Sequence, residues 1–399
     1  MSKLQELIQR LCPNGVEYKK LGEICIFKRG DVLSSKDAVE GDVPVMAGGQ
    51  KPSCYHNVPN RKGETIVVAG SGAYAGFVTY WNIPVFVSDA FSVHPIDGLL
   101  PKYVFHYLKN NQAKIHATKK GAGVPHVHGK DIAKFLIPVP PLEVQEEIVR
   151  ILDRFSDYAA ELQAELQARK EQYEYYRNLL LTFNPAGCAG EADDEQEGSV
   201  TTWGGHSYPI QWKTMGEIGK IKMCKRVMKN QTTDRGDIPF YKIGTFGKKA
   251  DAFISRKIFD EYKRLYSYPR KGTILVSASG TIGRCVVYEG EEAYYQDSNI
   301  VWLDNDESIV LNTYLYYYYQ IVNWNTEGGT IKRLYNDRFA STPIPIPPLE
   351  LQEKIVAILD RFETLVNDLS EGLPAEIAAV KEQYEYYRNR LLTFKEKTA

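Results

Sequence analysis

Two long blocks of sequence occur twice in this chain. Ile137–Phe155 reads IPVPPLEVQEEIVRILDRF, and IPIPPLELQEKIVAILDRF follows 207 residues later at Ile344–Phe362. A second pair, KEQYEYYRNLLLTF and KEQYEYYRNRLLTF, occupies Lys170–Phe183 and Lys381–Phe394. Near-identical segments that frame divergent ones predict a pseudo-twofold molecule with one scaffold and two different modules. Such a molecule suits two recognition surfaces better than a single catalytic pocket.

Each block predicts a long helix. Beyond Pro140 and Pro141, apolar residues recur alternately four and three residues apart, which is the heptad seam of a coiled coil. The first such segment, Leu142–Phe183, has 42 residues and would span roughly 60 Å at about 1.5 Å per residue. The second copy carries four extra residues, and Gly372 and Pro374 indicate a break there. We expect antiparallel pairing of the two helices within the chain, with pairing between chains as the alternative. The residues expected to pack the helices are Ile148, Leu152, Phe155, Leu162, Leu166, Tyr173, Tyr176, Ile355, Leu359, Phe362, Leu369, Ile377, Tyr384 and Tyr387.

The remaining sequence predicts two mixed modules. Short alternating runs rich in Val, Ile, Tyr and Phe, bounded by Gly, Pro and Asn, are typical of strands. The fold class expected is α+β: two mixed α/β domains separated by two long antiparallel coiled-coil helices. The boundaries expected are 1–139 for the first module, 140–183 for the first spacer helix, 184–202 for an acidic linker, 203–346 for the second module and 347–394 for the second spacer helix.

The two modules match weakly but in the same order. GETIVVAGSGAYAG at Gly63–Gly76 corresponds to GTILVSASGTIG at Gly272–Gly283, and FVSDAFSV at Phe86–Val93 to YYQDSNIV at Tyr294–Val301. GAGVPHV at Gly121–Val127 corresponds to GGTIKRL at Gly328–Leu334. The glycine-rich turns are either structural hairpins or places where the backbone approaches DNA closely.

Charge is segregated although the net charge is only −1. Residues 213–271 hold 16 Lys or Arg against 6 Asp or Glu, and residues 102–134 hold 7 Lys against one acid. Basic stretches in both modules favour contact with a phosphate backbone. The six cysteines form no CxxC pair or metal-like cluster, which favours reduced thiols. No signal pattern or membrane-length apolar run is present, so we expect a cytoplasmic protein.

Motifs for catalysis or cofactors are not convincing. Gly70, Gly72 and Ala75 satisfy the dinucleotide spacing, but the strand-like FVTYWNIPVFV follows where a helix is required. Gly123 to Lys130 has the wrong spacing for a P-loop. His126 and His128 could suggest a metal, but the second copy has Arg333 and Tyr335 there. We therefore expect no catalytic residue, no metal and no cofactor in this chain.

At the blocks IPxPPLExQExIVxILDRF and KEQYEYYRNxLLTF, and in its overall layout, the chain resembles the specificity subunit of type I restriction-modification systems. The resemblance implies two target-recognition domains, each reading one half of a bipartite, asymmetric site in double-stranded DNA. It also implies that the helices dock two methylation (M) subunits, that a restriction (R) subunit joins the complex, and that S-adenosylmethionine, ATP and Mg belong to these partners.

Candidate DNA contacts lie around the paired glycine turns and in basic loops, where Arg suits guanine and Lys suits phosphate. They are Lys28, Arg29, Ser71, Tyr74, Lys119, Lys120, His126 and Lys130 in the first module, and Lys225, Arg226, Lys248, Lys249, Ser279, Thr281, Lys332 and Arg333 in the second. The rival hypothesis is a two-armed protein scaffold that binds no nucleic acid. A steep salt dependence of DNA binding would separate the two.

Overall fold

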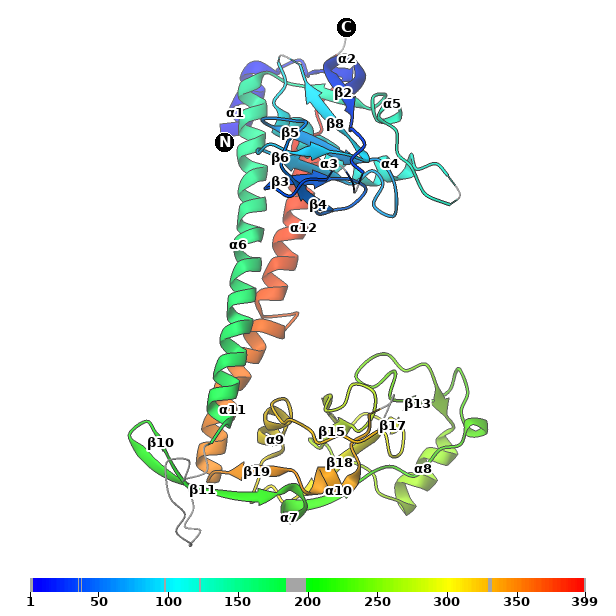
Figure 1. Cartoon of the computed structure of the whole chain (residues 1–399), viewed down its shortest axis with the longest axis vertical. Coiled ribbons are helices and arrows are strands. Elements are labelled where there is room, and N and C mark those ends of the chain that lie inside the picture. The colour runs from blue at the N-terminus through cyan, green and yellow to red at the C-terminus, as the bar shows by residue number, and fades with distance from the viewer. Residues whose placement is uncertain are drawn as a thin grey trace. The chain divides into compact units, whose positions relative to one another are not determined.

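The structure is a computed structural model that describes residues 3–34, 36, 38–96, 98–121, 123–183, 199–328 and 332–397 (Figure 1). It divides into two compact units. The first unit comprises Met1–Glu165 and Pro374–Ala399, and the second comprises Leu166–Leu373. Each unit therefore contains one module, the beginning of the helix that follows that module, and the end of the helix from the other repeat.

The first module is built on a four-stranded antiparallel sheet in the order β2-β8-β5-β6. A three-stranded sheet, β4-β3-β7, and a β1-β9 pair complete it. Apolar residues on β5 and β8 are buried against α3, and Ile66 and Tyr103 are completely buried. The elements are α1 (Lys3–Leu11), β1 (Glu17–Lys20), α2 (Leu21–Ile24), β2 (Cys25–Arg29), β3 (Val43–Met46), β4 (Cys54–His56), β5 (Thr65–Ala69), β6 (Val78–Trp81), β7 (Phe86–Val87), β8 (Ala90–Pro95), α3 (Pro101–Asn110), α4 (Gln112–Ala117), α5 (Gly129–Ile132) and β9 (Leu136–Val139).

The second module repeats this topology with a different sequence. Its sheets β12-β18-β15-β16 and β14-β13-β17 match those of the first module, including one parallel pair, β13-β17, in place of β3-β7. The elements are β10 (Ser199–Trp203), β11 (His206–Thr214), α7 (Met215–Ile218), β12 (Gly219–Lys222), η1 (Lys229–Gln231), β13 (Ile238–Tyr241), β14 (Phe253–Ile254), α8 (Arg256–Leu265), β15 (Ile274–Ser277), β16 (Cys285–Val287), β17 (Tyr294–Tyr295), β18 (Ile300–Asn305), α9 (Asn312–Tyr319), α10 (Asn336–Ala340) and β19 (Pro343–Ile346). The predicted fold of two mixed modules is confirmed.

Two details differ from the sequence-based expectation. Residues 184–198 of the expected linker lie outside the described residues, but its last residues, 199–202, form most of β10. The correspondence between β8 and β18 is also displaced by two residues. Val93 pairs with Phe27 in the first module, and Leu303 pairs with Ile221 in the equivalent pair of strands in the second. Because Phe27 and Ile221 hold the same position, Val93 corresponds to Leu303 and not to Val301. The connection before β18 is longer by two residues, which the sequence match concealed.

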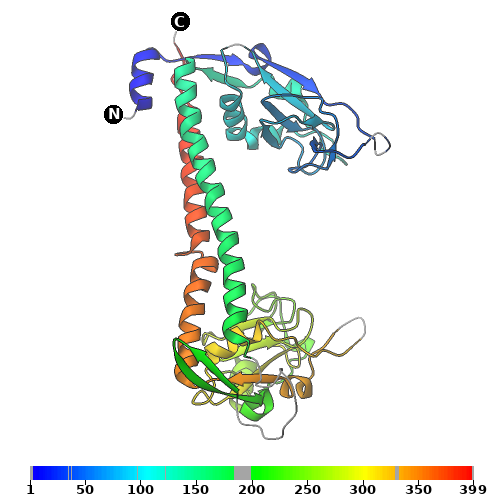
Figure 2. The same cartoon turned by 60° about the vertical axis from the view of Figure 1, so that its left-hand side comes forward.

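The long helices pair antiparallel within each unit. In the first unit, Phe155 of α6 (Leu142–Leu181) packs against Tyr384 and Tyr387 of α12 (Leu373–Leu391), with ring centroids 6.4 and 5.4 Å apart. Farther along α6, Tyr158 donates a hydrogen bond to Glu376, which lies earlier in α12. The two helices therefore run in opposite directions, and both views show them side by side (Figures 1 and 2).

In the second unit, the end of α6 meets α11 (Leu349–Asn367). Phe362 of α11 packs against Tyr173 and Tyr176, with centroids 6.5 and 5.6 Å apart. Most of the expected seam faces inward. The buried members are Ile148, Leu152, Leu162, Tyr173, Ile355, Leu359 and Ile377, and the half-buried ones are Phe155, Leu166, Phe362 and Tyr384.

Leu369 is an exception to the seam, because its side chain is 83% exposed. It falls between the end of α11 and the start of α12, where the expected break occurs. Gly372 permits this break because a Cβ there would lie 2.4 Å from the carbonyl oxygen of Thr364. Tyr176 and Tyr387 also keep about a third or more of their surface exposed, at 36% and 40%. These three residues contribute less to helix packing than their spacing predicts.

The repeated blocks attach each module to its helix by the same contacts. Gln145, at the start of α6, is buried, accepts from the Leu100 amide and donates to the carbonyls of Gly98 and Pro140. In the second unit, Gln352 accepts from the Leu311 amide and donates to the carbonyls of Ile309 and Pro347. These contacts use backbone atoms, so the attachment is independent of most module side chains.

Candidate nucleic-acid interface

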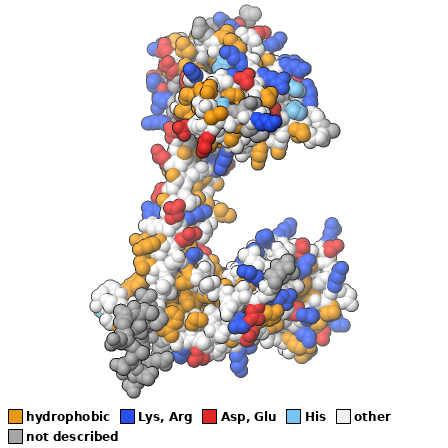
Figure 3. All heavy atoms as spheres, in the orientation of Figure 1, with side chains coloured by type: hydrophobic (Ala, Val, Ile, Leu, Met, Phe, Trp, Pro, Cys, Tyr) orange, Lys and Arg blue, Asp and Glu red, His pale blue; other side chains and the backbone are white. Residues whose placement is uncertain are grey.

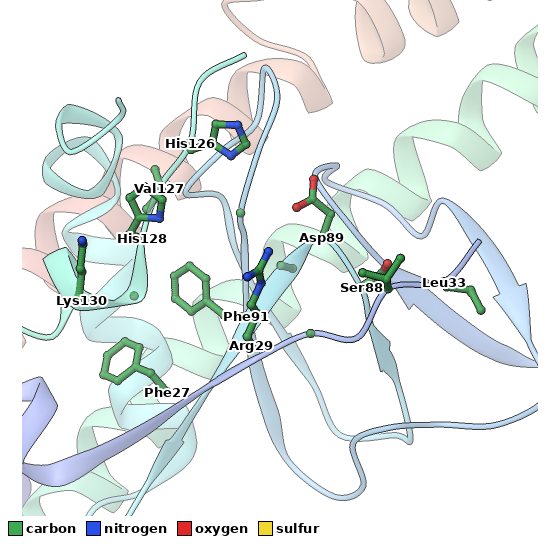
Figure 4. A pocket seen from close by; sticks show the side chains of 15 residues that line it. Phe27, Arg29, Leu33, Ser88, Asp89, Phe91, His126, Val127, His128 and Lys130 are labelled. Carbon is green, nitrogen blue, oxygen red and sulfur yellow. The ribbon is translucent and has the colours of Figure 1, made fainter. Parts of the chain in front are cut away.

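Each module has a cleft in the same place relative to its sheets. The first cleft, of about 680 Å³, lies between the end of β2, the β7–β8 connection and the segment that precedes and begins α5 (Figure 4). The second, of about 510 Å³, is lined by residues from the segment after β12, by the β17–β18 connection and by Arg333. The recurrence in two modules of different sequence points to a function that the shared fold serves.

The glycine-rich turn of the first module borders its cleft through Gly70. β5 is buried along its whole length and leads through Gly70 into a turn in which Gly72 and Gly76 have φ of +81° and +85°. A Cβ on Gly76 would lie 2.9 Å from the Ile115 side chain, so the close packing of this turn requires glycine. Strand β6 follows, as its sequence predicts, and a dinucleotide-binding turn would require a helix there.

The expected DNA contacts differ in their relation to the clefts. Arg29, His126 and Lys130 line the first cleft, and Arg226 and Arg333 line the second. The Arg29 side chain lies between Asp89 and the His126–Lys130 segment (Figure 4). Outside the lining are the exposed or half-buried residues Lys28, Ser71, Tyr74, Lys119, Lys120, Lys225, Lys248, Lys249, Thr281 and Lys332.

Several of these polar groups already have protein partners. Ser279 is only 5% exposed, and its hydroxyl donates to Asn299 Oδ1 at 2.7 Å, which leaves it little access to a ligand. Ser71 donates to Asp89, and Lys119 Nζ donates to the carbonyl oxygen of Ala73. Ion pairs engage Lys120 with Asp131 at 2.7 Å and Arg226 with Asp297 at 2.8 Å, and the Lys225 ammonium lies 4.9 Å from the Tyr266 ring centroid.

Some lining residues were not singled out from the sequence. Phe27 and Phe91, whose ring centroids are 6.2 Å apart, line the first cleft together with Asp89. The second cleft adds Lys229, Lys242, Gln296 and Asn299. The matched segments FVSDAFSV and YYQDSNIV contain Asp89, Gln296 and Asn299 and could have indicated them. The aromatic pair gave no such signal, because its members are remote in sequence.

The charge in the clefts is positive but largely compensated. Two basic residues, Arg29 and Lys130, and one acidic residue, Asp89, line the first cleft, whereas four basic and three acidic residues line the second. Arg226–Asp297 and Lys242–Asp251 are ion pairs. The guanidinium groups of Arg29 and Arg333 form neither a hydrogen bond nor an ion pair with any residue that the structure describes. Lysine and arginine side chains are visible over both units, with acidic ones among them (Figure 3).

Two pKa shifts show the local field in the first module. Burial lowers the pKa of His94, and the charges of Lys28 and Arg61 lower it further. Hydrogen bonding from Lys120, with a smaller effect from Lys134, outweighs desolvation and lowers the pKa of Asp131. The Asp131 shift reflects nearby positive charge, and the smaller part of the His94 shift does so as well. Such charge would favour an anionic ligand such as a phosphate backbone.

The described residues include no group of three or more His, Cys, Asp or Glu side chains placed to hold a metal ion. Burial raises the pKa of Cys25 and Cys224 to about 12, so these thiols are poor nucleophiles. No helix within the described ranges has the length and apolar character needed to cross a membrane.

The family described as "Type I restriction modification DNA specificity domain" matches residues 13–171 and again residues 209–379. A protein of Haemophilus influenzae named as a type I restriction enzyme specificity subunit is 42% identical, over 95% of this chain and 96% of its own length. The EcoR124I/EcoR124II specificity subunit of Escherichia coli is 30% identical over 74% of this chain and 71% of its own.

Two solved structures share the fold. The S subunit of a type I restriction-modification system from M. genitalium aligns with a TM-score of 0.56 and 16% identity, over 95% of this chain and 96% of its own. A chain from work on complex assembly and conformational transition of the type I R-M system aligns with a TM-score of 0.57 and 19% identity. The alignment covers 95% of this chain and 98% of that chain. At these identities the two structures support the fold alone.

Proposed function

The chain belongs to the family of type I restriction-modification specificity subunits, and from this premise we propose that its two modules divide the reading of one DNA site. Residues 1–139 and 203–346 would each recognise one half of a bipartite, asymmetric sequence in double-stranded DNA. The observation that carries this proposal is the pair of clefts, which occupy the same place in one fold but have different linings. One fold with two linings is what two unrelated half-sites require.

The catalytic steps would belong to partner subunits. The chain alone would neither methylate nor cleave DNA, and methylation subunits would bring S-adenosylmethionine and transfer the methyl group to adenine. Restriction subunits would bring ATP and Mg.

The helices would bind two methylation subunits. The KEQYEYYRNxLLTF segments expose apolar side chains in both units: Tyr175 and Leu179 on α6 are 63% and 56% exposed, and Tyr386 on α12 is 58% exposed. Tyr175 and Tyr386 are the same position of the repeated segment. Exposed aromatic residues are enriched in protein interfaces. Equivalent exposed tyrosines on a twofold scaffold favour two copies of one partner.

The test is adenine methylation in a host that lacks other methylation systems. Cells carrying this chain and its methylation subunits should acquire methylated adenines within one two-part motif, detected by methylation-sensitive sequencing. Cells carrying either component alone should acquire none. Methylation by the isolated, contaminant-free chain would refute the division of labour proposed here.

The scaffold alternative has its own measurement. Binding of the complex to a duplex with the motif should weaken linearly in log affinity with log salt, because phosphate contacts release counterions. A scaffold that does not touch nucleic acid would add no salt-dependent binding beyond that of its partners. The family match and the positive clefts both favour DNA recognition.

A further inference from the structure

His126 and Arg333 occupy one structural position in the two modules. Each forms an antiparallel bridge with the serine that begins the glycine turn, His126 with Ser71 and Arg333 with Ser279. Each forms a second bridge with the residue six positions earlier, Lys120 or Glu327. The same pair of bridges in both modules identifies this position independently of the weak sequence match.

The backbone at this position is fixed. The amide and carbonyl of His126 exchange hydrogen bonds with Lys120 at 2.8 and 2.9 Å, and those of Arg333 with Glu327 at 2.8 and 3.0 Å. The residue that follows is tied to the turn on its other side. The Val127 amide donates to the Gly70 carbonyl, and the Leu334 amide to the Ala278 carbonyl, both at 2.9 Å.

The next residue also fixes the direction of the side chain. Val127 and Leu334 are buried, with 2% and 4% exposure. Successive side chains of an extended segment point to opposite sides, so burial of Val127 and Leu334 directs His126 and Arg333 outward. Both line the cleft of their module. The fold therefore presents one side chain to the cleft from a backbone held by hydrogen bonds. The identity of that side chain differs between the modules.

The chemistry at this position differs as well. The His126 ring stacks on that of His128, with centroids 6.4 Å apart and an interplanar angle of 7°. Two of the three acidic residues that line the second cleft, Asp251 and Asp297, are paired with Lys242 and Arg226, and Asp234 is the third. The Arg333 guanidinium has no hydrogen bond or ion pair within the part of the chain that the structure describes. Its donors are directed into the cleft and available to a ligand.

We propose that Arg333 reads a guanine in the half-site of the second module, and that His126 is the base-reading residue at the equivalent position of the first. This inference rests on the proposed function. The planar fork of arginine matches the N7 and O6 acceptors of guanine in the major groove, whereas the lysine ammonium lacks the rigid fork and sits on a flexible stem. A residue that reads a base must be held in place by its surroundings. Its side chain must also differ between modules that read different bases, and this position meets both conditions.

The test uses the complete methyltransferase complex with wild-type chain, R333K, R333Q and the exposed control K257Q on α8. Methylation rates are measured on duplexes in which each base pair of the wild-type motif is replaced in turn. At one G·C pair of the second half-site, the preference of R333Q and R333K for guanine should fall roughly 5- to 150-fold, the range for loss of one bidentate base contact. Discrimination at the other base pairs should persist, and K257Q should keep the wild-type motif.

R333K separates base reading from phosphate contact. If Arg333 only contacts phosphate, R333K retains the charge and should behave like wild type, while R333Q loses activity equally on every duplex. This pair of results would overturn the proposal. A second half-site without a G·C pair would also overturn it, as would equal loss of activity on every duplex by variants that fold and assemble. A wild-type complex without any two-part motif would instead refute the proposed function. H126R should change the first half-site alone.

Discussion

The repeated glutamines show at the residue scale why the frame is duplicated. Gln145 and Gln352 each satisfy one amide and two carbonyls where a module meets its helix. Nearby, Asp153 of the LDRF segment accepts hydrogen bonds from His106 and Lys102. Burial alone would raise the pKa of Asp153, but these hydrogen bonds outweigh it and lower the pKa. The glutamine and the aspartate of the LDRF segment occur in both copies of the repeat, whereas the module residues around them differ.

Replacing Gln145 by leucine should therefore destabilise the first unit. Leucine fills similar space but leaves the Leu100 amide and two carbonyls without partners. A buried polar group left unpaired costs about 1–3 kcal/mol, so Q145L should lower the free energy of unfolding by at least about 2 kcal/mol. Denaturant unfolding measures this, with the exposed Gln163→Leu on α6 as control. Equal stability of the two variants would contradict the role of Gln145.

The repeated blocks differ at few positions, and one of these is Glu147 in the first copy and Lys354 in the second. The structure explains this difference. Glu147 pairs with Arg150 at 2.5 Å and with Lys3 of α1 at 3.0 Å. At the equivalent position, Lys354 meets Tyr208 of β11 at 3.1 Å and Glu350 at 2.6 Å. Each module supplies a different N-terminal element to the helix, so the charge at this position follows the partner.

This difference predicts a pH effect. The hydrogen bond from Arg150, helped by Lys3, lowers the pKa of Glu147 from 4.5 to about 2. A carboxylate with a depressed folded-state pKa contributes stability above its unfolded value, and the contribution is lost as pH falls toward the folded value. From about pH 6 to about pH 3, wild type should lose more stability than E147Q, while the exposed-site variant E146Q should follow wild type. Parallel curves for all three would contradict this assignment.

At the scale of elements, the sequence predicts the helices better than the modules. The seam of α6 and the break near Gly372 are readable because helical periodicity is local. The spacing of Leu369 could not show that α11 had already ended before this residue. The serine that begins each glycine turn could not show, from sequence alone, that Ser279 is buried. The two extra residues before β18 were hidden because FVSDAFSV and YYQDSNIV match well without a gap.

The first helix contains a tandem tetrapeptide, AELQAELQ, at residues 160–167. Four residues are close to the 3.6 of one helical turn, so one added AELQ nearly preserves the apolar face and adds roughly 6 Å of rise. Against about 3.4 Å per base pair, we predict a spacer between the half-sites longer by about one or two base pairs, with both half-sites unchanged. The methylated motif of the insertion variant is the measurement.

A two-residue insertion at the same place is the matched control. It rotates the following seam by about 200°, so the apolar residues of α6 no longer face their partner helix and assembly should fail. An active AELQ variant with an unchanged spacer would show that these helices do not set the distance between the half-sites.

At the scale of the whole molecule, the end of the chain belongs to the first unit. The Tyr18 hydroxyl donates to the Phe394 carbonyl at 2.9 Å, and Val16 bridges with Glu396. No local pattern predicts contacts across such a separation, although the second pair of repeated blocks indicates that both halves end alike. The expectation of two modules on one frame is confirmed, whereas the bases each module reads depend on side chains that differ between the modules.

We expect the two modules to read their half-sites independently. The most direct measurement replaces residues 1–136 by the corresponding module of a relative, assembles the chain with its methylation subunits, and determines the methylated motif by sequencing. Because Gln145 holds the module by backbone groups, the hybrid should assemble. We predict that one half-site changes while the other half-site and the spacer remain as in wild type. A simultaneous change in both half-sites, or no change in either, would refute independent reading by the two modules.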